Sequence, residues 1–213
     1  MKKFSNKYIF VYITVLVSVV AILLAIVSEF LKPMQQANRE RERVMQVLAS
    51  AGFTEPANHA LAFYKKVAED KILSDTTRVI QITRYDGQVS YVIRLDGKGL
   101  WGPIWGYVCI AQDGNTVEGA IFDHKSETPG LGAEIAKDNF CQSFKGKLLF
   151  DENGNFVSVR VLKGGTANHN INPLHGVDAI TGGTITSKGV DKMLHDGLQK
   201  YVPFLQSLHH RNK

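Results

Sequence analysis

The sequence predicts an α+β fold, in which helices pack on an antiparallel sheet, preceded by one N-terminal transmembrane helix. Three patterns lead to this prediction. An uncharged apolar run lies near the N-terminus, segments with a period of two are paired by Asp-Gly or Asn-Gly turns, and the C-terminal segment has apolar residues at helical spacing. The 213 residues therefore divide into a membrane anchor and one globular domain large enough to bury a core.

The anchor is the run at 9–27, IFVYITVLVSVVAILLAIV, whose 19 residues include 14 Ile, Leu, Val or Phe. As a helix it would be about 28 Å long, close to the hydrocarbon thickness of a bilayer. Insertion into the bilayer is favourable by roughly 4 to 8 kcal/mol. A cleaved signal peptide has a shorter apolar core and small residues at its cleavage site, and residues 28–32 offer no clean site. We therefore expect an uncleaved anchor, with a short cytoplasmic tail at 1–8 and a transmembrane helix at 9–31.

The net charge of +5 is concentrated at this end, because residues 1–43 hold seven Lys or Arg and three Glu. The rest of the chain is close to neutral, which excludes the basic face that nucleic-acid binding requires. The basic residues before and after the apolar run are nearly balanced, so charge alone does not orient the anchor.

The elements after the anchor follow from periodicity and turn residues. Residues 32–75 are expected to form a helical linker, with a bend at Pro33, a helix over 35–51 ended by Gly52, and a second helix over 57–73. The globular domain is expected over 76–213. Its strands are predicted to form three hairpins, at 79–85 with 89–95, 106–112 with 116–124, and 147–151 with 156–163. Residues 96–99 are expected to break a strand, and helices are expected at 134–144 and 187–208, the latter shortened by Pro203.

The stretch at 178–187, DAITGGTITS, places four hydroxyl residues and two adjacent glycines just before the last helix. Glycines let the backbone approach a ligand closely, and a helix N-terminus offers free N–H groups and a positive dipole end that suit a phosphate. An ordinary turn with a Ser or Thr N-cap needs only one hydroxyl and one glycine, so on local grounds it explains the stretch as well.

Two other glycine-rich stretches could face a ligand. In ETPGLGAE (127–134), Leu131 between two glycines could cover a flat ring, although an ordinary strand-to-helix loop fits equally. In GLWGPIWG (99–106), Trp101 or Trp105 could stack on an aromatic ligand, and Trp105 fits a core position better. Lys163, before Gly164, could pair with an anion or be a solvated strand end.

No metal site is expected, because the two cysteines, Cys109 and Cys141, belong to no CxxC motif and the histidines lack ligand spacing. A disulfide between the two cysteines remains open. The sequence shows no nucleophile elbow, Walker loop or dinucleotide fingerprint, and no catalytic acid, base or nucleophile is expected.

Four motifs together resemble a known family: GKGLWGPIWGY (97–107), HKSETPGLGAEI (124–135), VLKGG (161–165) and HGVDAITGGTITSKGV (175–190). The chain is similar to the NqrC subunits of the sodium-translocating NADH:quinone oxidoreductase, within the FMN-binding domain family that also holds RnfG of the Rnf electron-transport complex. RnfG-like members share ETPGLG and the threonine motif, whereas the GLW stretch and HGVD favour NqrC.

The resemblance implies a covalently bound FMN, esterified through its phosphate to the last Thr of a motif usually written [S/T]-G-A-T. That residue here is Thr184, with Thr181 and Gly182 at the first two positions and Gly183 where Ala is usual. A separate flavin transferase that uses FAD and a divalent metal installs the bond. The residues that would contact the isoalloxazine are Thr128, Gly130 and Leu131, with Trp101 and Lys163 as further contacts.

The implied function is an electron-transfer subunit of a membrane sodium-translocating NADH:ubiquinone or menaquinone reductase, assembled with other membrane subunits. The resemblance places it in the bacterial inner membrane as a single-pass protein, with its soluble domain on the periplasmic side. Two alternatives remain: an RnfG-like FMN subunit of an ion-translocating ferredoxin:NAD oxidoreductase, and a membrane-anchored scaffold without a redox role.

Overall fold

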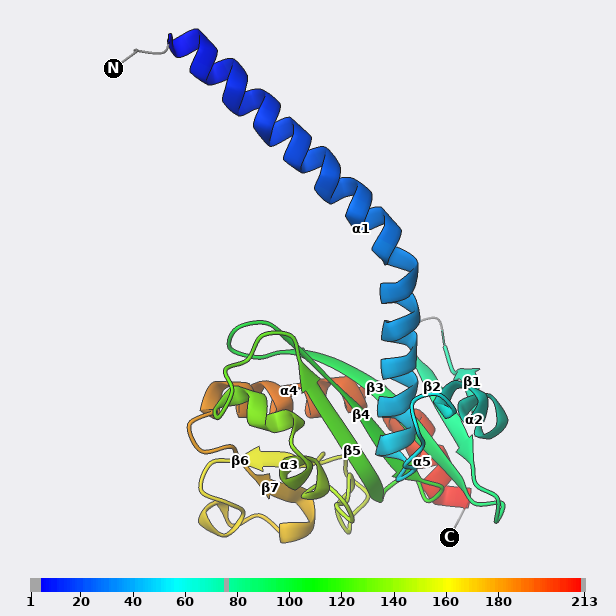
Figure 1. Ribbon diagram of the computed structural model, residues 1–213. Helices are drawn as coiled ribbons and strands as arrows, with labels where there is room; N and C mark the ends of the chain where they lie inside the picture. Colours follow the sequence, from blue (N-terminus) through cyan, green and yellow to red (C-terminus); the bar gives the residue numbers. More distant parts are fainter. Residues whose placement is uncertain (1–4, 75–76, 212–213) are drawn as a thin grey trace. The chain divides into compact units, whose positions relative to one another are not determined.

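The computed structural model describes residues 5–74 and 77–211 and contains two compact units, 1–43 and 44–213 (Figure 1). The helix α1 (Asn6–Ser50) includes an apolar stretch long enough to cross a membrane. Pro33 lies inside this helix, so residues 35–50 are helical as expected but continue directly from the apolar stretch. Loss of one backbone N–H at Pro33 is tolerated because strong helix formers flank it. The division of the N-terminal third at residues 8, 31 and 75 stays a prediction.

The 44–213 unit is built on an antiparallel sheet, in which each strand pairs with its neighbour in sequence. Within the described residues the strands are β1 (Ala68–Ile72), β2 (Arg78–Thr83), β3 (Val89–Lys98), β4 (Pro103–Ala111) and β5 (Val117–His124). The helices are α2 (Ala60–Val67), α3 (Asp138–Gln142), α4 (Thr184–Gln199) and α5 (Val202–Arg211), with 3-10 turns at Gly132–Ala136, Ala167–His169 and Pro173–His175. The expected α+β class with an antiparallel sheet is confirmed.

Both faces of the sheet are covered, which explains why β4 is apolar at successive positions rather than alternating. Val108 and Ile110 join the main core with α3, α4 and α5, whereas Tyr107 and Cys109 pack with Val47 of α1 on the other face. Neighbouring side chains of one strand therefore serve two cores.

This arrangement answers the open question about the cysteines. Cys109 belongs to the core against the end of α1, and Cys141 of α3 belongs to the core on the opposite face, and both thiols are free. Burial raises the pKa of both thiols. A disulfide between them is incompatible with this fold, because the sheet separates them.

Four expected elements differ from the structure. Residues 68–72 form the edge strand β1 rather than the end of a helix over 57–73, because pairing with β2 satisfies their backbone groups. The strand β3 continues through Asp96 to Lys98, paired with β4. The helix expected at 134–144 is a 3-10 turn followed by the short α3, and the helix expected at 187–208 starts at Thr184 and is divided into α4 and α5 before Pro203.

The third expected hairpin is also wrong. Residues 147–159 make only isolated bridges, Thr116 with Leu148 and Phe150 with Phe156. Instead β6 (Arg160–Leu162) pairs in parallel with β7 (Gly176–Asp178). Because the carboxyl ends of parallel strands lie at the same edge, this pair brings the loop after Leu162 beside the loop after Asp178.

Ser158 is a site of backbone strain in this region. It is fully buried with φ of 60°, and its hydroxyl has no hydrogen-bond partner among the described residues. We expect Ser158→Gly to stabilise the fold by about 1 kcal/mol, because relief of the left-handed backbone and of a buried unsatisfied hydroxyl outweighs the entropy of glycine. Thermal unfolding of the detergent-solubilised chain would measure it. Ser158→Ala, which removes the hydroxyl alone, should gain less; an equal gain would show that the backbone is not strained.

Candidate functional site

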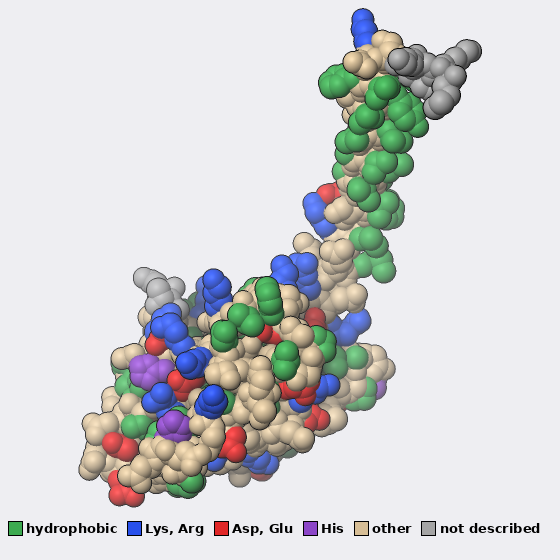
Figure 2. All heavy atoms as spheres, turned by 90° about the vertical axis from the view of Figure 1, so that its left-hand side faces the viewer, with side chains coloured by type: hydrophobic (Ala, Val, Ile, Leu, Met, Phe, Trp, Pro, Cys, Tyr) green, Lys and Arg blue, Asp and Glu red, His purple; other side chains and the backbone are tan. Residues whose placement is uncertain are grey.

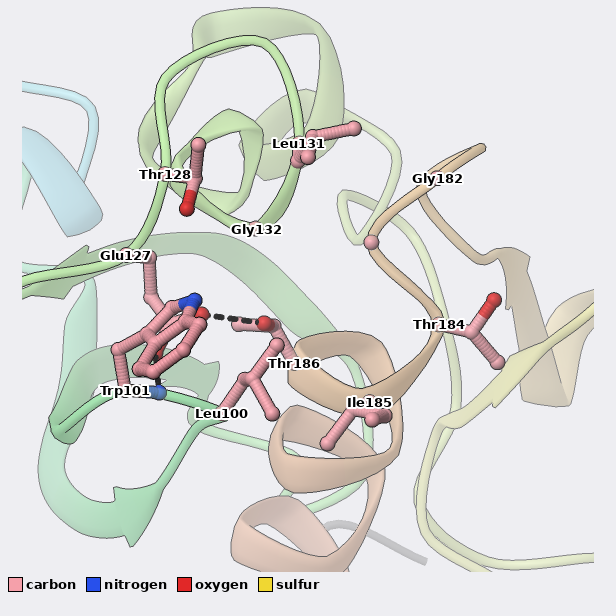
Figure 3. Close-up of a pocket in the computed structure, with 11 residues that line it drawn as sticks. Leu100, Trp101, Glu127, Thr128, Leu131, Gly132, Gly182, Thr184, Ile185 and Thr186 are labelled. Atoms are coloured by element: carbon pink, nitrogen blue, oxygen red, sulfur yellow. Dashed lines mark hydrogen bonds between the residues drawn. The ribbon is translucent and has the colours of Figure 1, made fainter.

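Three loops meet at the N-terminal end of α4 and enclose a cavity of about 230 Å³ (Figure 3). They are the turn at 99–102 between β3 and β4, the segment at 125–132 after β5, and the loop at 179–183 between β7 and α4. The lining residues are Leu100, Trp101, Glu127, Thr128, Leu131, Gly132, Gly182, Gly183, Thr184, Ile185 and Thr186. All three stretches singled out in the sequence therefore contribute to one site.

The loop before α4 depends on its two glycines. Gly182 has φ of 78°, and a Cβ there would lie 2.7 Å from the Leu131 Cδ2. At Gly183 a Cβ would lie 3.0 Å from the Ile180 Cγ2 and 3.1 Å from the Leu131 carbonyl oxygen. The loop can therefore pack closely against Leu131 only because both positions lack a side chain.

Helix α4 begins without a side-chain cap. Gly183 occupies the N-cap position, and no described side chain accepts a hydrogen bond there. The first backbone N–H groups of a helix have no partner within the helix, so they point out of the first turn, at the positive end of the dipole. The start of α4 is thus suited to an anion.

The four hydroxyls of this stretch have different environments. Thr186 and Ser187 are buried: the Thr186 hydroxyl donates to the Glu127 Oε2 at 2.5 Å, and the Ser187 Oγ accepts from the Ile180 N–H at 3.0 Å. Thr181 is exposed and outside the lining. Thr184 is half-buried in the first turn of α4 and lines the cavity. In Figure 3 its side chain projects away from Trp101.

Glu127 links its own segment to the turn at 99–102 and to the first turn of α4. Its Oε1 accepts the Trp101 N–H at 2.8 Å, and its Oε2 accepts the Thr186 hydroxyl. The residue is only 4% exposed. Burial raises the pKa of Glu127, but the hydrogen bonds from Thr186 and from the N–H groups of Trp101 and Gly102 outweigh burial and hold the pKa below its ordinary value. Glu127 is therefore ionised at neutral pH.

This lowered pKa makes part of the stability dependent on pH. A carboxyl whose pKa is lower in the folded than in the unfolded state stabilises the fold above its ordinary pKa of 4.5, and this contribution is lost as the pH falls through the folded pKa. We expect Glu127→Gln to lose less stability than the wild type when the pH is lowered from 7 into this acid range. Thermal unfolding at a series of pH values would show it, and parallel pH profiles of the two proteins would contradict it.

The rim of the cavity is apolar and exposed. Leu100, Trp101, Leu131 and Ile185 are 47%, 66%, 44% and 56% exposed. On the 44–213 unit, Figure 2 shows apolar side chains gathered together, with Lys and Arg side chains around them. Clustered apolar side chains with one flat aromatic ring among them suit a planar, largely apolar ligand.

The structure brings together six of the nine residues expected at the site: Trp101, Thr128, Leu131, Gly182, Gly183 and Thr184. Thr181, Gly130 and Lys163 are exposed and lie outside the lining. Lys163 lies directly after β6, next to the start of the β7–α4 loop, where the Ala179 N–H donates to the Leu162 carbonyl at 2.9 Å. The core interpretation of Trp105 is correct, because its indole N–H donates to the Gln46 Oε1 at 3.2 Å beside α1.

Sequence reasoning missed five lining residues: Leu100, Glu127, Gly132, Ile185 and Thr186. All five lie inside the motifs already quoted. Two residues could have been noticed: Glu127 is the one acidic residue of ETPGLG, and Thr186 is a second threonine in TITS. The two form a buried hydrogen bond in the folded chain.

The chain contains an FMN-binding domain, because the family model of that description matches residues 99–199. The chain belongs to the NqrC family of the Na⁺-translocating NADH-quinone reductase. It is 30% identical to the NqrC of Pseudomonas aeruginosa over 226 residues, covering 84% of this chain and 86% of the relative. It is 38% identical to that of Neisseria meningitidis serogroup A over 135 residues, which span 62% of this chain and only 50% of the relative.

A solved structure supports the same assignment. The crystal structure of NqrC from Parabacteroides distasonis superimposes with a TM-score of 0.73 at 38% sequence identity, covering 82% of this chain and 96% of the other. The corresponding structure of Shewanella oneidensis NqrC gives a TM-score of 0.66 at 26% identity, covering 80% of this chain and 99% of the other. The relatives are named as subunits of an oxidoreductase complex.

Proposed function

We propose that this chain is an electron-transfer subunit that carries FMN joined through its phosphate to Thr184, in a Na⁺-translocating NADH:quinone reductase. The observation that carries the proposal is which of the hydroxyl groups before and in α4 faces the cavity and which already make buried hydrogen bonds. Thr184 both lines the cavity and lies in the uncapped first turn of α4, whereas Thr186 and Ser187 already make buried hydrogen bonds.

The residues present fit FMN at both ends. The phosphate would lie at the start of α4, where free N–H groups and the helix dipole stabilise negative charge. The flat ring would lie between the Trp101 and Leu131 loops, whose side chains are apolar and exposed. The Thr184 side chain projects away from Trp101 in Figure 3, which leaves room for the ring and the phosphate of one ligand at different ends of the site.

The covalent bond requires a defined exchange. The Thr184 oxygen forms a bond to the phosphorus of the FMN half of FAD, the pyrophosphate bond of FAD breaks, AMP leaves, and the hydroxyl proton passes to a base of a separate flavin transferase. The bound flavin supplies the electron-carrying group. The chain itself positions that group, covers it with apolar side chains and tethers it.

The wider assembly is also part of the proposal. The apolar part of α1 would anchor the chain in the bacterial inner membrane, with the flavin domain on the periplasmic side, and other membrane subunits would supply NADH oxidation and quinone reduction. Affinity purification of the full chain from its native membrane, with identification of the copurifying proteins, distinguishes this assembly from a ferredoxin:NAD oxidoreductase.

The direct test is flavin fluorescence on a denaturing gel. The full chain, expressed together with a flavin transferase, should run as a fluorescent band, because only a covalent flavin survives denaturation. A dark band from such cells would contradict the proposal, and would favour a scaffold without a redox role.

A further inference from the structure

The carboxylate of Glu127 is held between the backbones of two glycines. At Gly99 a Cβ would lie 2.5 Å from the Glu127 Oε1, and at Gly132 a Cβ would overlap the Glu127 Oε2 and the Thr186 Oγ1. The carboxylate thus occupies space that a side chain at either glycine position would fill. Glu127 is fixed on its own backbone too, because its N–H donates to the His124 Nδ1 at 3.2 Å.

The hydrogen bonds of this carboxylate join elements that are far apart in sequence. Its Oε1 fixes the backbone N–H of Trp101, 26 residues earlier, and its Oε2 fixes the hydroxyl of Thr186, 59 residues later. Trp101 and Thr186 both line the cavity (Figure 3). Among the described residues no hydrogen bond runs directly from the Trp101 loop to the first turn of α4, so the link between them passes through Glu127.

Glu127 is also the one ionisable side chain among the described residues that line the cavity. A carboxylate held by one hydroxyl and backbone N–H groups, with no cation bonded to it in the described part of the chain, keeps its negative charge in a poorly solvated position. Negative charge at such a position opposes the addition of an electron to a neighbouring group more strongly than it would in water.

We propose that Glu127 is the positioning residue of this cavity: it locks the Trp101 loop against α4, and its charge lowers the reduction potential of the flavin that, under the proposed function, lies beside it. Two properties of one side chain are thereby assigned, a geometric one and an electrostatic one. Different substitutions separate them.

Glu127→Gln removes the charge and keeps the shape, because its oxygen still accepts from Trp101 and its amide can donate to the Thr186 hydroxyl. Glu127→Ala removes both the charge and the link. Glu134→Gln is the matched control, since Glu134 lies in the same motif and its Oε1 accepts the Gly130 N–H at 3.1 Å, but outside the cavity lining.

Two measurements on the full detergent-solubilised chain test the proposal. In flavin-free protein, amide hydrogen exchange at Trp101 should become about tenfold faster or more in Glu127→Ala, and change little in Glu127→Gln and Glu134→Gln. In flavin-loaded protein, redox titration should show a more positive potential in Glu127→Gln and an unchanged potential in Glu134→Gln.

Wild-type exchange at Trp101 in Glu127→Ala would overturn the positioning role, and equal potentials in the wild type and Glu127→Gln would overturn the electrostatic role. A chain that takes up no flavin from the transferase contradicts the proposed function and, with it, the electrostatic role. The exchange measurement on the flavin-free chain still decides the positioning role in that case.

Discussion

Thr184→Val should abolish the fluorescent band of this chain on a denaturing gel while leaving the domain folded. The substitution replaces one hydroxyl by a methyl group of similar size at a half-buried position in the first turn of α4, so we expect a change in stability within about 0.5 kcal/mol. It removes the oxygen that would form the bond to the phosphate. Coexpression with the flavin transferase, denaturing electrophoresis and ultraviolet illumination measure the result.

The controls for this experiment follow from the environments of the neighbouring hydroxyls. Thr184→Ser keeps an attacking oxygen and should retain fluorescence, whereas Thr181→Val changes the first position of the threonine motif and does not serve as a control. Thr186→Ala is a poorer control, because it removes a hydrogen bond to Glu127. A fluorescent band in Thr184→Val would place the attachment elsewhere.

The parts of the fold that are predictable from sequence depend on local chemistry. The turns at Asp86-Gly87 and Asp113-Gly114 specify the β2–β3 and β4–β5 hairpins, because they are followed and preceded by segments that fit a pleated sheet. The turn at Asn153-Gly154 carries the same local signal, yet its flanking segments make only one bridge, Phe150 with Phe156, and no ladder. There β6 pairs with β7, which lies more distant in the chain, and nothing in the local pattern indicates this pairing.

The same limit applies to β1. Residues 68–72 extend a helical pattern, but their backbone groups pair with the free edge of β2. Tertiary pairing outweighs a weak helix propensity at such a position. The turns and the periodicity predicted the fold class correctly, but whether residues 68–72 end a helix or form an edge strand depends on which sheet edge is available.

The site was partly predictable for a related reason. The adjacent glycines, Trp101 and the run of hydroxyl residues are unusual enough to be noticed in the sequence. The roles of Glu127 and Thr186 follow only from the hydrogen bond that they form in the folded chain. Lys163 lies in the loop after β6, beside the β7–α4 loop, yet outside the cavity lining. Sequence order gave no means of separating residues that line the cavity from those that lie next to it.

Gly132→Ala should disrupt the cavity, at a cost of about 2 to 4 kcal/mol in the free energy of unfolding. The glycine is buried, and a Cβ there would overlap both oxygens of the hydrogen bond between Thr186 and Glu127. The hydrogen bond must break, which leaves a buried carboxylate oxygen and a buried hydroxyl without a hydrogen-bond partner. Each such group costs about 1 to 3 kcal/mol. Thermal unfolding gives the stability, and amide exchange at Trp101 reports on the loop that Glu127 holds.

Gly130→Ala separates this effect from ordinary backbone strain in the same loop. Gly130 has φ of 75°, and a Cβ added there would have nothing within 4 Å. Alanine at this position therefore costs roughly 1 to 2 kcal/mol for its unfavourable backbone and leaves the Glu127 link intact. Gly132→Ala should accelerate exchange at Trp101, and Gly130→Ala should not, even if the two lose similar stability. If both variants change exchange equally, the loop responds to any strain within it, and the close approach of Glu127 and Thr186 at Gly132 has no special role in holding the cavity.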